Sequence, residues 1–471
     1  MKHVKIVATI GPRTCSASQV RGLVDAGMSV ARLNGSHADL DWHGAAIAVL
    51  RSEAPQLPIL LDIPGRKVRT VELEHEPTFA FGDTVVLTTS LEFSGRDKVP
   101  VSYDKLHQYV TSGDTVLADD GTLRFTVTDV QGPDIYCRAE IAGVLKSRKG
   151  INVPSADFPV EPLTERDGKM LDFAKSQGVD FVGISFVDDA ALVEEVRARL
   201  GEGGPQVLSK VENSGAMSNL DEVIRASDAI MIDRGDLSVE TDLETLALSQ
   251  KLILESARRN GRPVIVATEM LHSMIINPFP TKAEVCDISN AVLDGAAALM
   301  LSGETAIGDF PAEAVSLMSR VANAVSHSVH TTDERDEDLT SPRAMGEAID
   351  VLCKRLPITK IVAVTISGYA ARIVASFRPA QPILGVSNDA RSARCMNLYH
   401  GTEGVYLDMP FPRDSTDHIA ECLEALWRRG KLAADDLVLV TAVGYPKAGT
   451  RMNTIQTHHV SDLIDGLEWI S

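Results

Sequence analysis

The chain has 471 residues, 44% hydrophobic and 5% aromatic, and its acidic residues outnumber the basic ones by 65 to 46. This composition is typical of a globular enzyme of about three domains and excludes a disordered chain. The formal net charge of -19 argues against nucleic acid as a partner, so any anionic ligand must be bound by a local basic cluster.

The cysteines and the apolar runs argue against a disulfide-rich, zinc-binding, secreted or membrane-spanning protein. The six cysteines are dispersed without CxxC or Cys/His spacing, which indicates neither a disulfide framework nor a zinc site. We expect reduced thiols and a cytoplasmic protein. The first apolar run is short and stops at Gly11 and Pro12, so it predicts a strand rather than a signal peptide. No apolar stretch approaches the ~18 residues of a membrane span.

Short β-branched and aliphatic runs alternate with amphipathic stretches, the pattern of parallel strands joined by helices. The runs are 5–10, 29–34, 59–63, 181–186, 206–213, 229–236, 263–268 and 298–304. Between them, 16–27, 188–201, 218–228 and 243–261 show helical spacing of apolar residues. We therefore predict a (β/α)8 TIM barrel, an α/β fold.

Two further units interrupt or follow the barrel. The third run ends at 63 and the fourth begins only at 181, and alternating segments between them predict a small β-barrel domain inserted at 71–155. The charged stretch 331–342 predicts a linker. Helix and strand patterns resume at 343–471 and predict a doubly wound α/β domain. The barrel itself would comprise 1–70 and 156–330.

Polar residues follow the predicted barrel strands at their carboxyl ends, where such barrels carry their active sites. They are 9–12, Arg32, Asn34, Ser36, Asp62, Ser185, Lys210, Glu212, 234–236, Thr268 and 302–304. Lys210 and Glu212 are two apart on one strand, so both side chains leave the same face, and Asp236 ends the next strand.

These residue types indicate a divalent metal and an anionic substrate. The carboxylates of Glu212 and Asp236 are oxygen ligands that suit Mg2+ or Mn2+, and the absence of clustered His or Cys argues against zinc. Burial of Lys210 beside them is costly unless it faces an anion such as a phosphoryl group. Three alternatives to a functional role remain open. Lys210 and Glu212 could form only a structural ion pair, residues 32–36 could be only a polar strand end, and His37 could be a surface residue.

Many segments resemble, in order, motifs of the pyruvate kinase family. They are KIVATIGP, ARLNGSHA, LLDIPGRKVRT, ADDGTL, KGINVP, LSKVENSGAMSNLDEVI, IMIDRGDLSVE, VIVATEMLHSMIINPFPTKAEVCDISNAVLDG and LMLSGETAIGDFP. The match continues in the C-terminal domain at 367–372 and 446–450. It implies phosphoryl transfer from phosphoenolpyruvate to ADP, giving pyruvate and ATP, with Mg2+ or Mn2+, and a homotetramer.

The resemblance also implies roles for individual residues. Lys210 and Arg32 would contact the phosphoryl group, Glu212 and Asp236 would hold the metal, and Thr268 would lie near the enolate carbon. The implied substrate contacts are Arg32, Lys210, Gly235, Asp236 and Thr268, and the implied nucleotide contacts are Pro12, His37 and Arg69. The inserted domain would be a lid that excludes water, with the loop at 119–120 facing metal and nucleotide.

One departure from the family pattern concerns monovalent cations. Residues 63–69 read IPGRKVR in place of Thr-Lys-Gly-Pro-Glu-Ile-Arg, so Lys67 replaces the glutamate of potassium-dependent members. In those members the ion lies among groups that match Asn34, Ser36 and Asp62. Because the ammonium of Lys67 would supply the missing positive charge, we expect activity without added K+.

Other departures touch the substrate and effector sites. Gly35 replaces Phe, Asp233 replaces Ala, Ser238 replaces Gly and Glu269 replaces Gln. Asp233 lies beside the backbone that would meet the substrate carboxylate, where a like charge weakens binding unless it points away. Ala370 stands where effector-binding members offer a hydroxyl, so the C-terminal domain is expected to be mainly an assembly surface.

Two alternative functions remain compatible with the sequence. A barrel lyase or aldolase would use the metal at Glu212 and Asp236 to stabilise a pyruvate enolate without a nucleotide. A lyase or aldolase would account for these two carboxylates, but not for the inserted lid domain or for Lys210. A catalytically weakened relative would act as a metabolite sensor, which the departures at 35, 63, 67 and 233 keep open.

Overall fold

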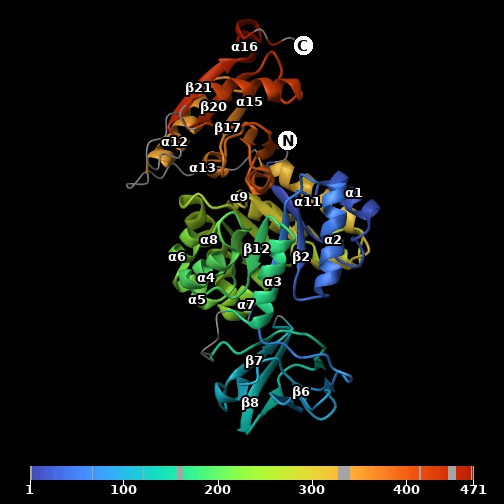
Figure 1. The fold of residues 1–471 in the computed structure, drawn as a ribbon. Helices are drawn as coiled ribbons and strands as arrows, with labels where there is room; N and C mark the ends of the chain where they lie inside the picture. The colour runs from blue at the N-terminus through green and yellow to red at the C-terminus, as the bar shows by residue number, and fades with distance from the viewer. Residues whose placement is uncertain are drawn as a thin grey trace.

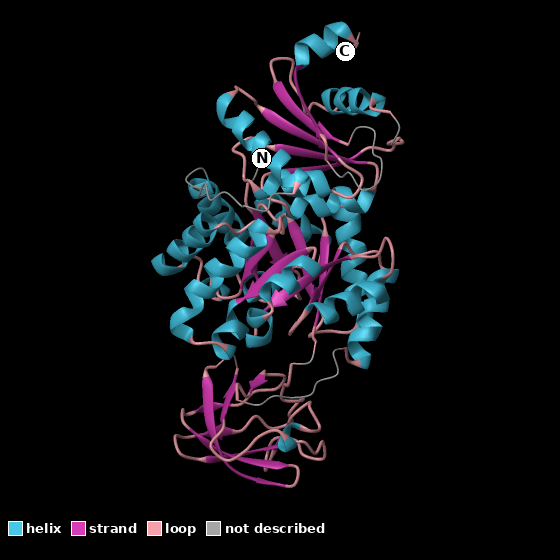
Figure 2. Cartoon of the chain, turned by 90° about the vertical axis from the view of Figure 1, so that its left-hand side faces the viewer, coloured by secondary structure: helices cyan, strands magenta, loops and turns pink. Residues whose placement is uncertain are grey.

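A computed structural model of the chain describes residues 3–65, 67–119, 121–155, 163–326, 340–412, 415–443, 452–467 and 469. A barrel forms the middle of an elongated molecule (Figure 1). The inserted β-sheets lie beyond one end of the barrel and the C-terminal α/β domain lies at the other end (Figures 1 and 2). No helix among the described residues is long and apolar enough to cross a membrane.

The barrel is a closed ring of parallel strands in the order β1-β16-β15-β14-β13-β12-β3-β2. The strands are β1 (Lys5–Thr9), β2 (Val30–Asn34), β3 (Ile59–Ile63), β12 (Phe181–Ile184), β13 (Gln206–Val211), β14 (Ala229–Asp233), β15 (Val264–Ala267) and β16 (Ala298–Leu301). All eight predicted strands are present. They are buried at nearly every position because helices cover the outer face of the ring (Figure 2) and the apolar side chains of the strands belong to buried hydrophobic clusters.

Helices of the barrel cover the outer face of this ring, as the sequence predicts. They are α1 (Ala17–Ala26), α2 (Leu40–Glu53), α3 (Glu165–Ser176), α4 (Ala190–Leu200), α5 (Ser214–Ser218), α6 (Leu220–Ala226), α7 (Arg234–Glu240), α8 (Leu246–Arg259), α9 (Lys282–Asp294), α10 (Gly303–Ala306) and α11 (Pro311–Val325), with 3-10 turns at Leu243–Thr245 and His272–Ile275. Capping side chains start several of them. Thr281, for example, accepts a hydrogen bond from the backbone of Glu284 at its hydroxyl, and the carboxylate of Glu284 accepts one from the backbone of Thr281.

Six of the barrel strands end one to three residues earlier than predicted, and in two of them the last predicted residues belong to a helix. The run at 229–236 is a strand only to Asp233, and Arg234 begins α7, so Asp236 lies in the first turn of a helix. An acidic residue is favoured there because backbone N–H groups point toward the helix start. Glu304 likewise lies in α10, where it accepts hydrogen bonds from the backbone of Leu271 and Ser302.

The insertion between β3 and α3 consists of β-sheets. Its strands are β4 (Thr78–Phe79), β5 (Thr84–Thr88), β6 (Val99–Pro100), β7 (Thr115–Ala118), β8 (Leu123–Gln131), β9 (Asp134–Ala139), β10 (Gly143–Val144) and β11 (Ile151–Asn152), with a 3-10 turn at Leu106–Gln108. Six of the described strands form one sheet in the order β11-β7-β8-β9-β5-β6, and β10 pairs with β4. A hydrophobic core of its own, centred on Phe125, fills this part.

The C-terminal α/β domain holds a five-stranded sheet in the order β19-β18-β17-β20-β21. Its elements are α12 (Ser341–Arg355), β17 (Lys360–Val364), α13 (Tyr369–Ser376), β18 (Ile383–Ser387), α14 (Ala390–Cys395), a 3-10 turn (Met396–Leu398), β19 (Thr402–Tyr406), α15 (Asp417–Arg428), β20 (Leu437–Ala442), β21 (Thr454–His459) and α16 (Val460–Gly466). Only β21 is antiparallel. Residues 331–339 of the predicted linker, Asp120 and 446–450 lie outside the described residues.

A buried carboxylate connects the C-terminal domain to the barrel. Asp180 precedes β12 and is fully buried. Its Oδ1 accepts a hydrogen bond from Arg394 Nε at 2.8 Å, across to the C-terminal domain. Its Oδ2 accepts from Arg51 Nη2 at 2.7 Å and from the backbone of Ile59 at 2.8 Å. The domain contact therefore lies at the end of the barrel opposite the polar strand ends.

Candidate active site

Lys210 lies among carboxylates at the end of the barrel that faces the insertion. Its Nζ is 2.8 Å from Glu212 Oε2 and 3.0 Å from Asp233 Oδ2, and it donates to Ser185 Oγ at 3.3 Å. Lys210 is on β13 and Asp233 ends the neighbouring β14. The two-residue spacing thus places Lys210 and Glu212 on one face, as predicted.

Burial and mutual charge control the protonation of this cluster. Burial opposes the charged form of Lys210, but the carboxylates around it, Asp62 first, hold its pKa well above the usual range. Burial raises the pKa of Glu212 to about 8, with the like charge of Asp236 adding to it. Burial opposes the charged form of Asp233, but Lys210, Lys67 and Arg32 together outweigh it and lower the pKa to about 2. Burial raises the pKa of Asp236. Glu212 is therefore the carboxylate that holds a proton most readily.

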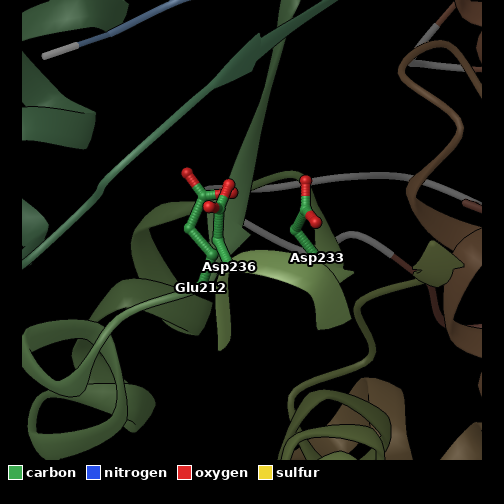
Figure 3. A group of neighbouring side chains, drawn as sticks. All are labelled: Glu212, Asp233 and Asp236. Carbon is green, nitrogen blue, oxygen red and sulfur yellow. The ribbon is translucent and has the colours of Figure 1, made fainter. Parts of the chain in front are cut away.

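Three carboxylates form a set that fits a divalent cation. Glu212, Asp233 and Asp236 each offer an oxygen, and these oxygens lie within 4.8 Å of one another. Figure 3 shows the three side chains pointing the same way, with Asp233 set apart from the other two. All three are buried. An all-carboxylate set suits Mg2+ or Mn2+ better than zinc.

Lys67 reaches the same cluster from the loop after β3. Its ammonium pairs with Asp236, and both side chains are less than one tenth exposed. A Cβ built on Gly150 of the insertion would lie 2.4 Å from Lys67 Cε, so this glycine leaves the room that the lysine occupies. The ammonium of Lys67, which was predicted to belong to a monovalent-cation site with Asn34, Ser36 and Asp62, thus contacts a predicted metal ligand.

Arg32 is fixed by two partners on neighbouring strands. Its Nε donates to Asp62 Oδ2 at 3.1 Å, its Nη2 pairs with the same oxygen, and its Nη1 donates to Thr9 Oγ1 at 3.1 Å. Arg32 is 6% exposed and Asp62 3% exposed. Such a fixed guanidinium is suited to orient an anion at the barrel end.

The loop after β2 is shaped by a glycine. Asn34 Oδ1 accepts from the backbone of Ser36 at 3.1 Å, and the backbone of Gly35 donates to the carbonyl of Asp62 at 2.8 Å. A Cβ on Gly35 would lie 2.2 Å from Met170 Cε and 2.8 Å from that carbonyl oxygen. The position therefore excludes any side chain in this packing.

Strained backbone residues flank the cluster. Thr268 follows β15 with φ 69° and Phe186 follows β12 with φ 54°, a left-handed conformation that is rare for bulky residues. Thr268 Oγ1 accepts from the backbone of Gly235 at 2.9 Å, and the backbone of Phe186 donates to Glu212 Oε1 at 2.7 Å. The left-handed residue Thr268 thus has its hydroxyl next to the backbone N–H of Gly235. The resemblance implies that both residues contact the substrate.

A cleft of about 1140 Å³ lies between the insertion and the barrel, next to this cluster. Its basic lining residues are His37, Lys67, Arg69, Lys105, Arg148 and Arg166. Burial, and next Arg69, lower the pKa of His37. His37 and Arg69, two of the predicted nucleotide contacts, line the cleft. Pro12, the third predicted contact, is exposed and does not line it. Pocket volumes of this order accommodate nucleotide-sized ligands.

Two features of the site were not predicted. The pairing of Asp233 with Lys210 was missed, because a carboxylate at 233 was expected to oppose the substrate rather than to neutralise a lysine. Arg148 and Arg166 were missed because they lie in polar segments that carry no periodic pattern. Asp119 of the predicted lid loop pairs with Lys149 Nζ at 2.7 Å.

Most of the chain matches two known family models. Residues 1–315 match the model of the pyruvate kinase barrel domain, and residues 343–458 match that of the pyruvate kinase alpha/beta domain. The chain belongs to the pyruvate kinase family. Similar curated proteins named pyruvate kinase include that of Bacillus licheniformis, 36% identical over 98% of this chain and 81% of the relative. That of Geobacillus stearothermophilus is 37% identical over the same shares.

A relative of nearly equal length is the pyruvate kinase of Mycobacterium tuberculosis (strain H37Rv). It is 37% identical over 97% of this chain and 98% of its own length. The pyruvate kinase fold predicted from the sequence is therefore confirmed, with the barrel, the added β-sheets and the C-terminal α/β domain. Lys67 and Asp233 lie in one buried cluster, where Lys67 pairs with Asp236 and Asp233 pairs with Lys210.

Proposed function

We propose that the chain is a pyruvate kinase that transfers the phosphoryl group of phosphoenolpyruvate to ADP, giving pyruvate and ATP. The bond from phosphorus to the enol oxygen breaks, and a bond from phosphorus to a terminal oxygen of ADP forms. The enolate then takes a proton at its methylene carbon. The observation that carries the proposal is the buried Lys210, 2.8 Å from Glu212 and 3.0 Å from Asp233, at the end of a pyruvate kinase barrel.

A divalent cation, Mg2+ or Mn2+, would be held by Glu212 and Asp236. The fit rests on the buried carboxylate oxygens, which lie within 4.8 Å of one another. When bound, the ion supplies positive charge that neutralises the oxygens of the phosphoryl group. Asp233 lies close enough to join this ligand set.

The roles of the surrounding side chains follow from charge and position. Lys210 and Arg32 hold the phosphoryl group, because each is a buried cation fixed by carboxylates at the same barrel end. The backbone N–H of Gly235 and the hydroxyl of Thr268 lie together, near the place of the enolate carbon. We propose that His37 and Arg69 contact the nucleotide in the cleft, and that Pro12, which does not line the cleft, contacts it from outside.

The inserted domain, 71–155, acts as a lid over this site. Its Asn152 donates to Glu240 of α7 at 2.8 Å, and a Cβ on its Gly121 would lie 3.2 Å from Val239. Exclusion of water by such contacts prevents hydrolysis of the phosphoryl group. We further propose that no K+ is required, that the protein is cytoplasmic and that it assembles as a homotetramer through the C-terminal domain, 343–471.

The test is pyruvate release from phosphoenolpyruvate, measured with lactate dehydrogenase, with and without ADP, in Mg2+ and in Mn2+. The wild type is compared with Lys210→Met and with the control Lys169→Met, an exposed residue of α3 outside the cleft that pairs with Glu165. Turnover that needs ADP and is lost only in Lys210→Met supports the proposal. Pyruvate release from a longer keto acid without ADP would identify a lyase instead. No turnover with either substrate would indicate a sensor protein.

A further inference from the structure

A second cluster of cations lies at the other end of the barrel, in a small cleft against the C-terminal domain. Arg258 and Arg262 line it from the barrel side, at and just after the end of α8. Arg372, Arg378 and His400 line it from the C-terminal domain. Among the described residues that line this cleft none is acidic.

The arginines use only part of their hydrogen-bonding capacity. Arg372 Nη1 donates to the carbonyl of Gly261 at 2.9 Å, Arg262 Nη2 to that of Arg225 at 2.7 Å, and Arg378 to that of Gly295. One distant counter-charge is present, since Asp228 Oδ1 is 3.9 Å from Arg262 Nη1.

Several donors in the cleft remain unsatisfied. Arg262 Nε, Arg378 Nη1 and His400 Nδ1 are buried and have no hydrogen-bond partner among the described residues. His400 is 5% exposed. Burial, and next the charge of Arg258, lower the pKa of Arg378 to about 10. Buried donors of this kind cost stability unless a partner occupies the space between them.

The backbone at Arg378 indicates that its side chain is needed. Arg378 has φ 54°, just after the end of α13, where a left-handed residue is usually glycine. A non-glycine residue there is strained. On the facing side, a Cβ on Gly295 would lie 3.3 Å from Arg378 Nη2, so the glycine permits the close approach.

The cleft has room for a small ligand only. Its volume is about 30 Å³, and a water molecule needs about 10–15 Å³ in the same measure. A single oxyanion fits, whereas a nucleotide or a sugar phosphate does not. Guanidinium groups from two sides match the tetrahedral arrangement of oxyanion lone pairs.

We propose that this cleft is a binding site for a free inorganic oxyanion of the size of phosphate, held by Arg258, Arg262, Arg378 and His400. The site is separate from the cluster around Lys210, and its existence does not depend on the proposed activity. The side chains that hold the anion come from both the barrel and the C-terminal domain. The bound anion therefore fixes the orientation of the C-terminal domain relative to the barrel.

The test is equilibrium dialysis of the full chain against radiolabelled phosphate, without divalent metal and at constant ionic strength. Lys210→Met is the background, because it removes the competing cation at the other end of the barrel. We expect one phosphate per chain in this background. Adding Arg258→Gln should raise the dissociation constant about tenfold or more, as loss of a charge-assisted hydrogen bond does. Sulfate should compete, and glycerol 3-phosphate should not.

A matched control is Arg259→Gln, the next residue of α8, which is exposed and pairs with Glu255. It should leave phosphate binding unchanged. Arg378→Gly gives a second variant that suits the backbone at φ 54° and should also lose the anion. Absence of phosphate binding in the Lys210→Met background would overturn the proposal. Equal loss in Arg259→Gln, or equally tight binding of glycerol 3-phosphate, would do so as well.

Discussion

The ammonium of Lys67 pairs with the carboxylate of Asp236, 169 residues away in the chain. Asp236 belongs to the carboxylate set that fits a divalent cation. The ammonium of Lys67 therefore lies beside the proposed metal site, although its backbone belongs to the loop after β3. The lysine brings one positive charge into the cluster and Asp233 brings one negative charge. Their side chains thus offset each other within one buried site.

Replacement of Lys67 by glutamate should create a requirement for K+. The variant lacks the fixed ammonium and regains the acid of potassium-dependent members, so a monovalent ion must supply the charge. In buffer with tetramethylammonium as the only other cation, added K+ should raise turnover of Lys67→Glu about tenfold, equivalent to ~1.4 kcal/mol in the barrier. Wild type and the control Lys169→Glu, at an exposed position of α3 outside the cleft, should change little. A many-fold rise in the wild type itself would contradict K+ independence.

Replacement of Asp233 by asparagine should weaken the binding of Mn2+ in the absence of substrates. The variant keeps the shape of the side chain and removes one of the clustered charges, so affinity should fall about tenfold, in line with loss of one carboxylate. Titration of free Mn2+ by electron paramagnetic resonance measures the change. Asp104→Asn, in the cleft but outside the cluster, is the control. Unchanged Mn2+ affinity would remove Asp233 from the ligand set.

Metal affinity should depend on pH through Glu212. Its pKa is raised to about 8, so below that pH the carboxyl holds a proton that the metal must displace. Affinity for Mn2+ should therefore rise with pH, by up to about tenfold per unit, and level off above about 8. Glu212→Gln should bind Mn2+ weakly and lose the slope. A flat profile between pH 6 and 8 in the wild type would show that Glu212 is already ionised.

Removal of Asp180 should loosen the contact between barrel and C-terminal domain. Asp180→Ala leaves Arg51 and Arg394 without their buried partner, which should lower the free energy of unfolding by about 3–5 kcal/mol. Urea denaturation followed by circular dichroism measures the loss. Asp172→Ala breaks an exposed pair with Arg199 and should leave the midpoint nearly unchanged. Equal midpoints for the two variants would argue against a supporting role for Asp180.

The sequence predicts most of the fold because its signals are local. Buried aliphatic runs give all eight barrel strands, and period-two spacing places Lys210 beside Glu212. The antiparallel edge strand β21 was not predicted, since its sequence TIQTHH is polar and lacks an apolar face. The contacts of Lys67 with Asp236 and of Arg258 with the C-terminal domain join distant segments. No local pattern encodes such pairings, and only the folded chain brings them together.

Gly35 limits how this lineage can change. An aromatic residue at that position would have to displace Met170 and also move the backbone carbonyl of Asp62, the residue that orients Arg32. A single substitution of this kind would therefore disturb the carboxylate that holds Arg32. A larger residue at position 35 requires a second substitution that empties the space, so packing makes the two changes depend on each other.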